Sequence, residues 1–304
     1  MTPSTLAERV PPITWFAVSA VFHYLGPAFA VLLFPAIGVL GIAWLRIASA
    51  ALLLAPIARP WRAVGDWERK DWVLQVALGA TLAAMNATFY LALDRLPMSL
   101  VASIEFVGVV ALALVGLRSR RNLLALALTV AGVGLLIDVT WSDDLLGLFW
   151  ASANGLLFVA YVVLGHRLAA SGASRGVSGL GTAMAIAMLI ALPFGIGEAW
   201  SVIDSPLLLL AGIGVGLCSS VIPYICDQLA MSRLPRASFA LLLSILPASA
   251  TLIAAIVLAQ IPSVSDLLGI GLVMLGVATH KPTASARAAD QGGQDQEDGE
   301  EDRG

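Results

Sequence analysis

The sequence predicts an all-α integral membrane protein with ten transmembrane helices, and three observations support this fold class. Hydrophobic residues make up 59% of the 304 residues and charged residues only 12%, about half of the charged fraction in soluble domains. Ten apolar stretches are each close to the length of about 20 residues that a helix needs to cross the hydrocarbon core of a bilayer. Lys and Arg gather in alternate connections between these stretches, which is typical of multi-pass membrane proteins.

The ten stretches follow one another through short connections, so neighbouring helices are expected to run antiparallel. No signal-peptide cleavage pattern follows the first stretch, and we therefore expect it to remain as a permanent helix. The predicted spans are 13–34, 36–57, 72–93, 98–116, 122–138, 147–166, 178–199, 207–230, 237–259 and 265–280.

The distribution of basic residues predicts the orientation of the chain. With the N-terminus in the cytoplasm, fifteen of the 17 Lys and Arg residues fall on the cytoplasmic side. Arg95 alone falls outside, and Arg46 lies within a span. Because basic residues accumulate in cytoplasmic connections, both termini are predicted to be cytoplasmic.

The last stretch of the chain, 281–304, differs from the rest. It carries seven acidic residues against three basic ones, which accounts for the net charge of −3 and leaves +1 for residues 1–280. This tail has no aromatic or branched apolar residue, so we expect it to be disordered. No basic surface remains to bind nucleic acid, which is therefore not an expected partner.

Motifs for enzymatic chemistry or nucleotide hydrolysis are missing from the sequence. We find no cluster of His, Cys, Asp and Glu at metal-ligand spacing, no Walker Gly-Lys-Ser/Thr and no catalytic triad pattern. The Gly132-x-Gly134 pair lies in an apolar span without a preceding strand, which argues against a dinucleotide fingerprint. The sequence therefore predicts no metal, no cofactor and no enzyme.

A short segment occurs twice in the chain. The sequence ALDRLP at 92–97 returns as AMSRLP at 230–235. Each copy joins a third helix to a fourth if the chain divides into five-helix units at 1–142 and 143–280. Because five is odd, the second unit must enter the membrane inverted. Inverted repeats are common in secondary transporters, whose substrate site lies between the halves near the bilayer midplane.

Ionisable residues within spans cost about 2.5–3.5 kcal/mol at a helix centre on insertion scales, and they are candidate functional residues. Arg46 is the deepest, and its guanidinium is suited to pair with a carboxylate. Glu105 lies seven residues into the fourth span. Burial disfavours its charged form and a nearby arginine favours it, a combination that suits a group exchanging protons near neutral pH. A fixed Arg46–Glu105 pair that braces the bundle is the alternative.

Other polar residues within the spans extend the candidate site. Asp227 and Tyr224 share one face of a helix that Pro223 can open, and an interfacial cap is the alternative for Asp227. Asn86 and Tyr90 lie four residues apart on one helix face, where they are candidates to hydrogen-bond a substrate or a neighbouring helix.

His23 is a candidate proton carrier, because an unperturbed histidine titrates near neutral pH. It precedes Gly26-Pro27, where the first helix is expected to break. A packed, hydrogen-bonded histidine is the alternative.

Four segments resemble the EamA-type transporters of the drug/metabolite transporter superfamily, and among them the bacterial threonine/homoserine exporter group. WLRIA at 44–48 is similar to the Leu-Arg-Leu-Ala of the second helix, and MNATFYL at 85–91 is similar to the Met-Asn-x-x-Phe-Tyr-Leu of the third. IEFVG at 104–108 resembles the Leu-Glu-Phe-Thr-Gly of the fourth helix. IPY at 222–224 with Asp227 resembles the Leu-Pro-Tyr-Ser-Leu-Glu of the eighth. The resemblance covers the ten predicted spans and leaves out the acidic tail.

The resemblance implies a secondary transporter of the bacterial inner membrane that exports small metabolites, amino acids such as threonine or homoserine, by proton-coupled alternating access. Its expected partners are a small-molecule substrate, protons and the lipid bilayer, and the oligomeric state is left open. Proton coupling is expected of Glu105 and His23. The expected substrate-binding residues are Arg46, Asn86, Tyr90, Tyr224 and Asp227.

The sequence also departs from the family pattern. Leu246-Pro247 stands where the ninth helix of the family has Glu-Pro, and Gln260 replaces a glutamate that commonly follows it. One alternative function is export of drugs or lipophilic cations, although the first helix lacks the acid that small multidrug exporters use. The other is a membrane enzyme or a non-transporting assembly protein. The sequence does not support an enzyme, because no nucleophile, base or metal ligands lie at the same depth in the predicted spans.

Overall fold

The computed structural model describes residues 10–59, 67–115, 120–140, 144–169, 173–202, 204–234 and 246–279. Within these residues all regular structure is helical, as the sequence predicts. Part of the predicted span 237–259 and the whole tail 281–304 lie outside the described residues.

The helices agree with the predicted spans to within five residues at each end that the structure describes. The eighth predicted span is composite, because a π-helical segment (η3) interrupts it between α10 and α11. The elements are α2 (Pro12–Ile37), α3 (Val39–Ala58), α5 (Arg69–Leu93), α6 (Met98–Val115), α7 (Arg120–Thr140), α8 (Leu145–Ala169), α9 (Ala173–Ala199), η2 (Trp200–Val202), α10 (Pro206–Gly216), η3 (Leu217–Val221), α11 (Ile222–Met231), α13 (Leu246–Val257) and α14 (Val264–Thr279).

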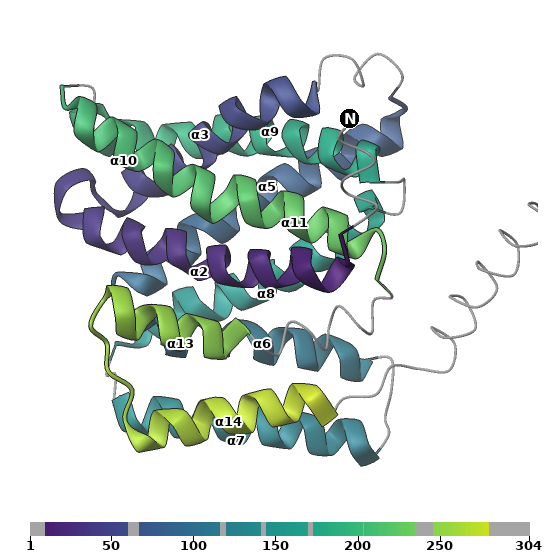
Figure 1. The fold of residues 1–304 in the computed structure, drawn as a ribbon, viewed down its shortest axis with the longest axis vertical. Helices are drawn as coiled ribbons and strands as arrows, with labels where there is room; N and C mark the ends of the chain where they lie inside the picture. Colours follow the sequence, from purple (N-terminus) through teal and green to yellow (C-terminus); the bar gives the residue numbers. More distant parts are fainter. Residues whose placement is uncertain are drawn as a thin grey trace, which may run out of the picture.

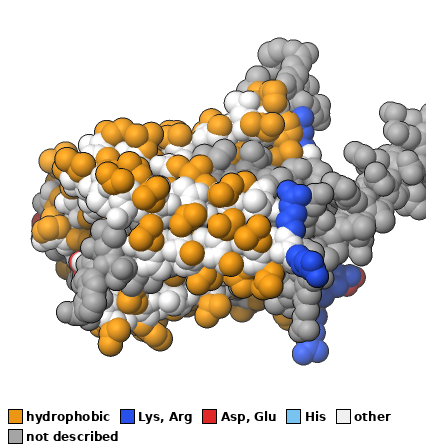
Figure 2. Space-filling view, turned by 90° about the horizontal axis from the view of Figure 1, so that it is seen from below, with side chains coloured by type: hydrophobic (Ala, Val, Ile, Leu, Met, Phe, Trp, Pro, Cys, Tyr) orange, Lys and Arg blue, Asp and Glu red, His pale blue; other side chains and the backbone are white. Residues whose placement is uncertain are grey.

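The outer surface of the bundle is suited to lipid. Among the described residues, 6 helical segments are long and apolar enough to cross a membrane, and three shorter apolar helices accompany them. Outward-facing side chains such as Leu52, Leu156 and Leu207 are exposed, and Figure 2 shows hydrophobic side chains across most of the described part of one face. An exposed apolar surface of this extent is that of a membrane protein. The long spans are Pro12–Ile37, Val39–Pro56, Arg69–Leu93, Leu145–Leu168, Ser178–Ala199 and Pro206–Ala230.

Helices that are distant in the sequence lie side by side (Figure 1). α3 packs along α9, α7 packs along α14, and α5 packs along both α8 and α9. The composite helix α10–η3–α11 packs against α2 and α3, while α13 packs against α2 and α6. Helices from the first half of the chain therefore pack directly against helices from the second half.

A sharp junction joins α2 to α3 at Gly38. Its φ of 87° lies in the left-handed region that glycine adopts at little cost. Glu198 of α9 reaches this junction, and its Oε2 accepts a hydrogen bond of 2.8 Å from the N–H of Gly41. The carboxylate thereby satisfies one of the open N–H groups at the start of α3, a role that the sequence does not predict.

α2 is continuous through Pro27 and Pro35, so the break expected at Gly26-Pro27 is wrong. A proline inside a helix removes one backbone hydrogen bond, and tertiary packing compensates for this loss. At Gly26, α2 approaches η3 so closely that an added Cβ would lie 2.5 Å from the backbone nitrogen of Ser219. Contacts with η3, α11 and α13 hold α2 in place.

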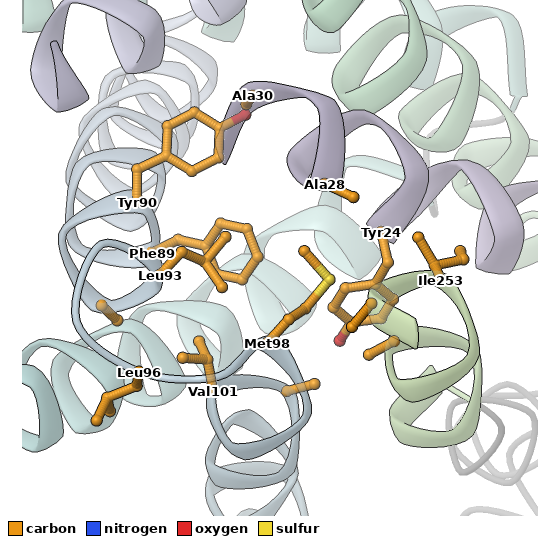
Figure 3. Packing of buried hydrophobic residues seen from close by; sticks show 14 of the residues in the cluster. Tyr24, Ala28, Ala30, Phe89, Tyr90, Leu93, Leu96, Met98, Val101 and Ile253 are labelled. Carbon is orange, nitrogen blue, oxygen red and sulfur yellow. The ribbon is translucent and has the colours of Figure 1, made fainter. Parts of the chain in front are cut away.

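Buried apolar side chains fill the space between α2, α5, α6 and α13 (Figure 3). Tyr24, Phe89, Met98 and Ile253 are all buried in this cluster. Burial of such side chains contributes about 1.5–3 kcal/mol each in water, whereas in a bilayer close packing supplies more of the association energy. Phe89 of this cluster also lines a small polar pocket.

Candidate functional site

A small polar pocket lies where α2, α3, α5, α6, α8 and α11 meet. Its volume is about 10 Å³, about what a single water molecule requires. The walls combine an acidic and a basic residue with neutral polar and aromatic ones. The lining residues are His23, Arg46, Met85, Asn86, Phe89, Glu105, Asn154, Phe158 and Tyr224.

The pocket collects most of the candidate site residues. Tyr90 lies beside it, with its ring centroid 5.4 Å from the guanidinium carbon of Arg46. Asp227 does not line it. The candidates that line the pocket are His23, Arg46, Asn86, Glu105 and Tyr224.

Arg46 is only 3% exposed, and the segment before α11 holds its side chain. Its Nε donates to Oγ of Ser220 at 2.8 Å, and its Nη2 donates to the carbonyl oxygen of Ser219 at 2.7 Å. Pro223, four residues later, has no N–H and cannot give that carbonyl an α-helical hydrogen bond. The segment Leu217–Val221 is π-helical, a conformation that is frequent at functional sites. The proline thus provides a backbone acceptor for the guanidinium.

Glu105 is also 3% exposed and accepts two hydrogen bonds from neutral groups. Its Oε2 accepts from the Tyr24 hydroxyl at 3.2 Å, and its Oε1 accepts from Nδ2 of Asn154 at 2.5 Å. Among the described residues, no ion pair joins Glu105 to Arg46. The structure therefore does not contain the fixed Arg46–Glu105 brace, and a basic and an acidic side chain line one pocket without forming an ion pair.

Two amide oxygens at the pocket wall, Oδ1 of Asn86 and Oδ1 of Asn154, are buried without a hydrogen-bond partner among the described residues. Asn86 uses its Nδ2 to donate to the carbonyl oxygen of Leu82 at 2.7 Å. Buried polar groups in proteins are nearly always hydrogen-bonded. A hydroxyl or ammonium group of a small ligand is a chemically suitable partner for both oxygens.

His23 stands at the pocket wall between two aromatic rings. Its ring centroid is 5.2 Å from that of Tyr24 and 6.2 Å from that of Phe158, edge to face in both cases. These contacts orient the imidazole in the pocket that Glu105 and Arg46 also line.

Asp227 lies outside the pocket but is buried, at 6% exposure. Its Oδ1 accepts a hydrogen bond of 2.5 Å from Oγ of Ser19 on α2, so its position between α2 and α11 argues against an interfacial cap. Tyr224, on the same face of α11, lines the pocket and stacks on Tyr161, with ring centroids 5.4 Å apart.

Known proteins resemble this chain over most of its length. Residues 145–279 match the EamA-like transporter family. Over 273 residues the chain is 31% identical to the threonine/homoserine exporter RhtA of Escherichia coli (strain K12), an alignment that covers 86% of this chain and 88% of that protein. The chain belongs to the EamA-like transporter family.

Further relatives agree with this assignment. The threonine/homoserine exporter RhtA of Salmonella typhimurium (strain LT2) is 29% identical over 228 residues, which cover 74% of this EamA-like transporter and 76% of that protein. A protein of known crystal structure aligns with a TM-score of 0.56 over 91% of this chain and 98% of that chain. At 18% identity this likeness shows a shared fold alone. The family assignment and the apolar helices together identify the protein as a multi-pass membrane transporter.

Four polar residues of the EamA-like transporter's site are not predicted by the sequence analysis: Tyr24, Asn154, Ser219 and Ser220. Asn154 has a usable signal, because an amide in the middle of the predicted span 147–166 is costly in lipid unless it is hydrogen-bonded. Tyr24 and the two serines have none, because such residues are tolerated in apolar helices whether or not they contact a ligand.

A second, larger cavity of about 360 Å³ lies where the α5–α6 connection meets the α13–α14 connection. Asp94, Arg95, Gln260 and Asp266 contribute to its walls. In the part of the chain that the structure describes, no group of three His, Cys, Asp or Glu residues is placed to hold a metal ion.

Proposed function

We propose that this EamA-like transporter exports small amino acids of the threonine and homoserine class. The proposal rests mainly on Arg46 and Glu105. These two buried side chains, one basic and one acidic, line the same pocket but form no ion pair with each other. A zwitterion presents one charge to each: its carboxylate suits the guanidinium fork of Arg46, and its ammonium suits Glu105. The relatives named threonine/homoserine exporters, similar over most of their length, support this substrate class.

The neutral groups of the pocket are proposed to bind the rest of the substrate. Asn86 and Tyr224 reach the same space from α5 and α11, and Tyr90 stacks beside Arg46. A substrate hydroxyl would complete the hydrogen bonding of the Asn86 or Asn154 amide oxygens. Because the pocket has room for about one water molecule, helices must separate to admit an amino acid.

Proton coupling is proposed for Glu105, with His23 beside it. If one carboxylate binds either the substrate ammonium or a proton, the transporter cannot carry both at the same time. This mutual exclusion is the requirement for exchange. His23 lines the same pocket and provides a second group that can hold a proton.

Two inverted five-helix repeats, 1–142 and 143–280, are proposed as the moving units. Two observations support this division. Both copies of the repeated segment form the same turn. In the first copy the N–H groups of residues 95 and 96 donate to the carbonyl of 92, and that of 94 donates to 90. In the second copy those of 233 and 234 donate to the carbonyl of 230, and that of 232 donates to 228. The packing of α5 on α8 and α9 has its counterpart in that of α10–η3–α11 on α2 and α3.

The substrate site then lies between the repeats, as alternating access by rocking of the two halves requires. Asn86 and Tyr224 occupy equivalent positions when the two copies of the repeated segment are aligned, and both face the pocket. Each repeat would therefore contribute one neutral polar group from the same place in its third helix.

The proposed location is the bacterial inner membrane, with both termini in the cytoplasm. Figure 2 shows Lys and Arg side chains gathered at one end of the described bundle. This distribution supports the orientation that the positive-inside rule predicts. It places the α5–α6 connection, with Arg95, on the outer side.

Counterflow in proteoliposomes tests the proposal. Vesicles loaded with unlabelled threonine or homoserine should accumulate the labelled amino acid, and an imposed pH gradient should drive saturable transport. Labelled tetraphenylphosphonium serves as the lipophilic-cation control. Flux of that cation without amino-acid flux would replace the proposal by drug export, and no amino-acid flux in folded protein would refute the substrate class.

A further inference from the structure

Asp227 has no cationic partner in its buried position. No Lys, Arg or His nitrogen forms an ion pair with it among the described residues. Its neighbours are neutral: Ser19 of α2 at 2.5 Å, and the Tyr161 side chain of α8, whose hydroxyl approaches without a hydrogen bond of good geometry. Glu105, by contrast, shares its pocket with Arg46.

A carboxylate in such surroundings is much less costly when it carries a proton. Burying an unpaired charge costs several kcal/mol, and a transmembrane carboxyl without a cation avoids this cost by neutralisation. The titratable side chains around Asp227 are Tyr161, Tyr224 and Cys226, with His23 one turn beyond Ser19 on α2. α9 also packs on α11, and its residues 178–192 contain no ionisable group.

The heavy-atom geometry around Ser19 is satisfied by a protonated Asp227. Oγ of Ser19 lies 2.5 Å from Oδ1 of Asp227 and 3.3 Å from the carbonyl oxygen of Pro223. One hydroxyl hydrogen can serve only one of these two acceptors. If the carboxyl group donates to Oγ, the serine hydrogen can bond the carbonyl, whose helical donor within α11 is the N–H of Asp227.

Two aromatic hydroxyl residues connect Asp227 to the central pocket. Tyr161 is in ring contact with Tyr224 at 5.4 Å, and Tyr224 lines the pocket with Arg46 and Glu105. The hydroxyls of both tyrosines are buried without a hydrogen-bond partner of good geometry among the described residues. Hydroxyls in this position can pass a proton between two carboxyl groups, directly or through a water molecule.

The Ser19–Asp227 hydrogen bond also crosses an interface that alternating access would open. Ser19 belongs to α2 and Asp227 to α11, 208 residues later. Towards its C-terminus α11 ends near Arg233, on the side proposed to be cytoplasmic. Separation of α2 from α11 would bring Asp227 into contact with cytoplasmic water.

We propose that Asp227 is the proton-release group of the transporter: it receives the proton from the central pocket through Tyr224 and Tyr161 and releases it to the cytoplasm when α2 and α11 separate. The proposal rests on the proton-coupled exchange proposed above. It makes Asp227 a proton carrier, not a group that contacts the substrate.

The test compares two kinds of transport by Asp227→Asn in proteoliposomes with labelled threonine. Counterflow with the same pH on both sides of the membrane needs no net proton movement, and its rate should equal that of the wild type. Uptake driven by a pH gradient should fall to the level measured with vesicles that contain no protein. Asp227→Glu restores the carboxyl group and should restore gradient-driven uptake. Asp204→Asn removes an exposed carboxylate and should change neither.

Loss of both activities in folded Asp227→Asn would show that Asp227 contacts the substrate, and retention of both would show that it carries no proton; either result overturns the proposal. Infrared difference spectra between acidic and alkaline buffer provide a readout without substrate. The carboxylic-acid band of the wild type should lose one component in Asp227→Asn, and an unchanged band overturns the proposal. If the wild type moves no threonine, the proposed function fails, and this band still decides the protonation of Asp227.

Discussion

Nη2 of Arg46 donates to the carbonyl oxygen of Ser219 at 2.7 Å, and Pro223 cannot give that oxygen an α-helical hydrogen bond. The proline thus keeps this oxygen available to the buried guanidinium of Arg46. The same side chain faces the pocket that Glu105 borders from α6, so the anchor also fixes the distance between the two charges.

Pro223→Ala should weaken the binding of threonine. The new N–H group competes for the Ser219 carbonyl, and Arg46 loses one hydrogen bond. A hydrogen bond to a charged group contributes about 1.5 kcal/mol or more, so the affinity measured by counterflow should fall roughly tenfold. Pro206→Ala is the control, because Pro206 stands in the first turn of α10, where an N–H has no helical acceptor. Wild-type affinity in Pro223→Ala would show that the proline has no part in the site.

Arg46→Lys should bind a carboxylate substrate more weakly although the charge is retained. Lysine is a point charge that cannot hold Ser219, Ser220 and a carboxylate in one planar arrangement. We expect an affinity for threonine at least about tenfold lower, equivalent to roughly 1.4 kcal/mol. Arg69→Lys, at the exposed start of α5, should behave like the wild type. Full affinity in Arg46→Lys would exclude bidentate recognition.

Glu105→Gln should lose pH-driven transport. The amide has nearly the shape of the carboxylate and can still accept from Tyr24, but it cannot bind a proton. Transport rates of the variant in a pH gradient should therefore equal those without one. Asp204→Asn serves again as the control for removal of a carboxylate. If folded Glu105→Gln keeps the wild-type pH dependence, the proton is carried elsewhere.

Asp144 should stabilise the folded protein in a pH-dependent way. The Gly147 N–H and the guanidinium of Arg95, each 2.8 Å from the carboxylate, hold the pKa of Asp144 below its usual value. Because this pKa is lowered by folding, the stabilisation is complete above the unfolded value of about 3.9 and is lost as the pH falls through the folded value.

Thermal unfolding in detergent checks this prediction between about pH 7 and about pH 3. Asp144→Asn should lower the melting temperature at neutral pH, and its difference from the wild type should shrink as the solution becomes acidic. Arg95→Ala should reproduce part of the effect. A difference that is constant over this range would show that the carboxylate charge is not the stabilising element.

The sequence by itself determined the membrane class, the positions of the helices that the structure describes and most of the polar residues of the pocket. An apolar stretch long enough for a bilayer must become a helix, because every backbone group needs an internal partner in lipid. A residue such as Arg46 or Glu105 in such a stretch carries a cost that only a polar interior can offset. Both properties are local, so they can be recognised without knowledge of the fold.

Only the tertiary structure decided which groups meet. Glu105 is bound by Asn154, 49 residues later, and Asp227 by Ser19, 208 residues earlier. The tertiary structure also places Asp227 outside the pocket and keeps α2 continuous through Pro27. These outcomes depend on how each helix is rotated against its neighbours, which close packing over many weak contacts determines, and no short stretch of sequence records that rotation.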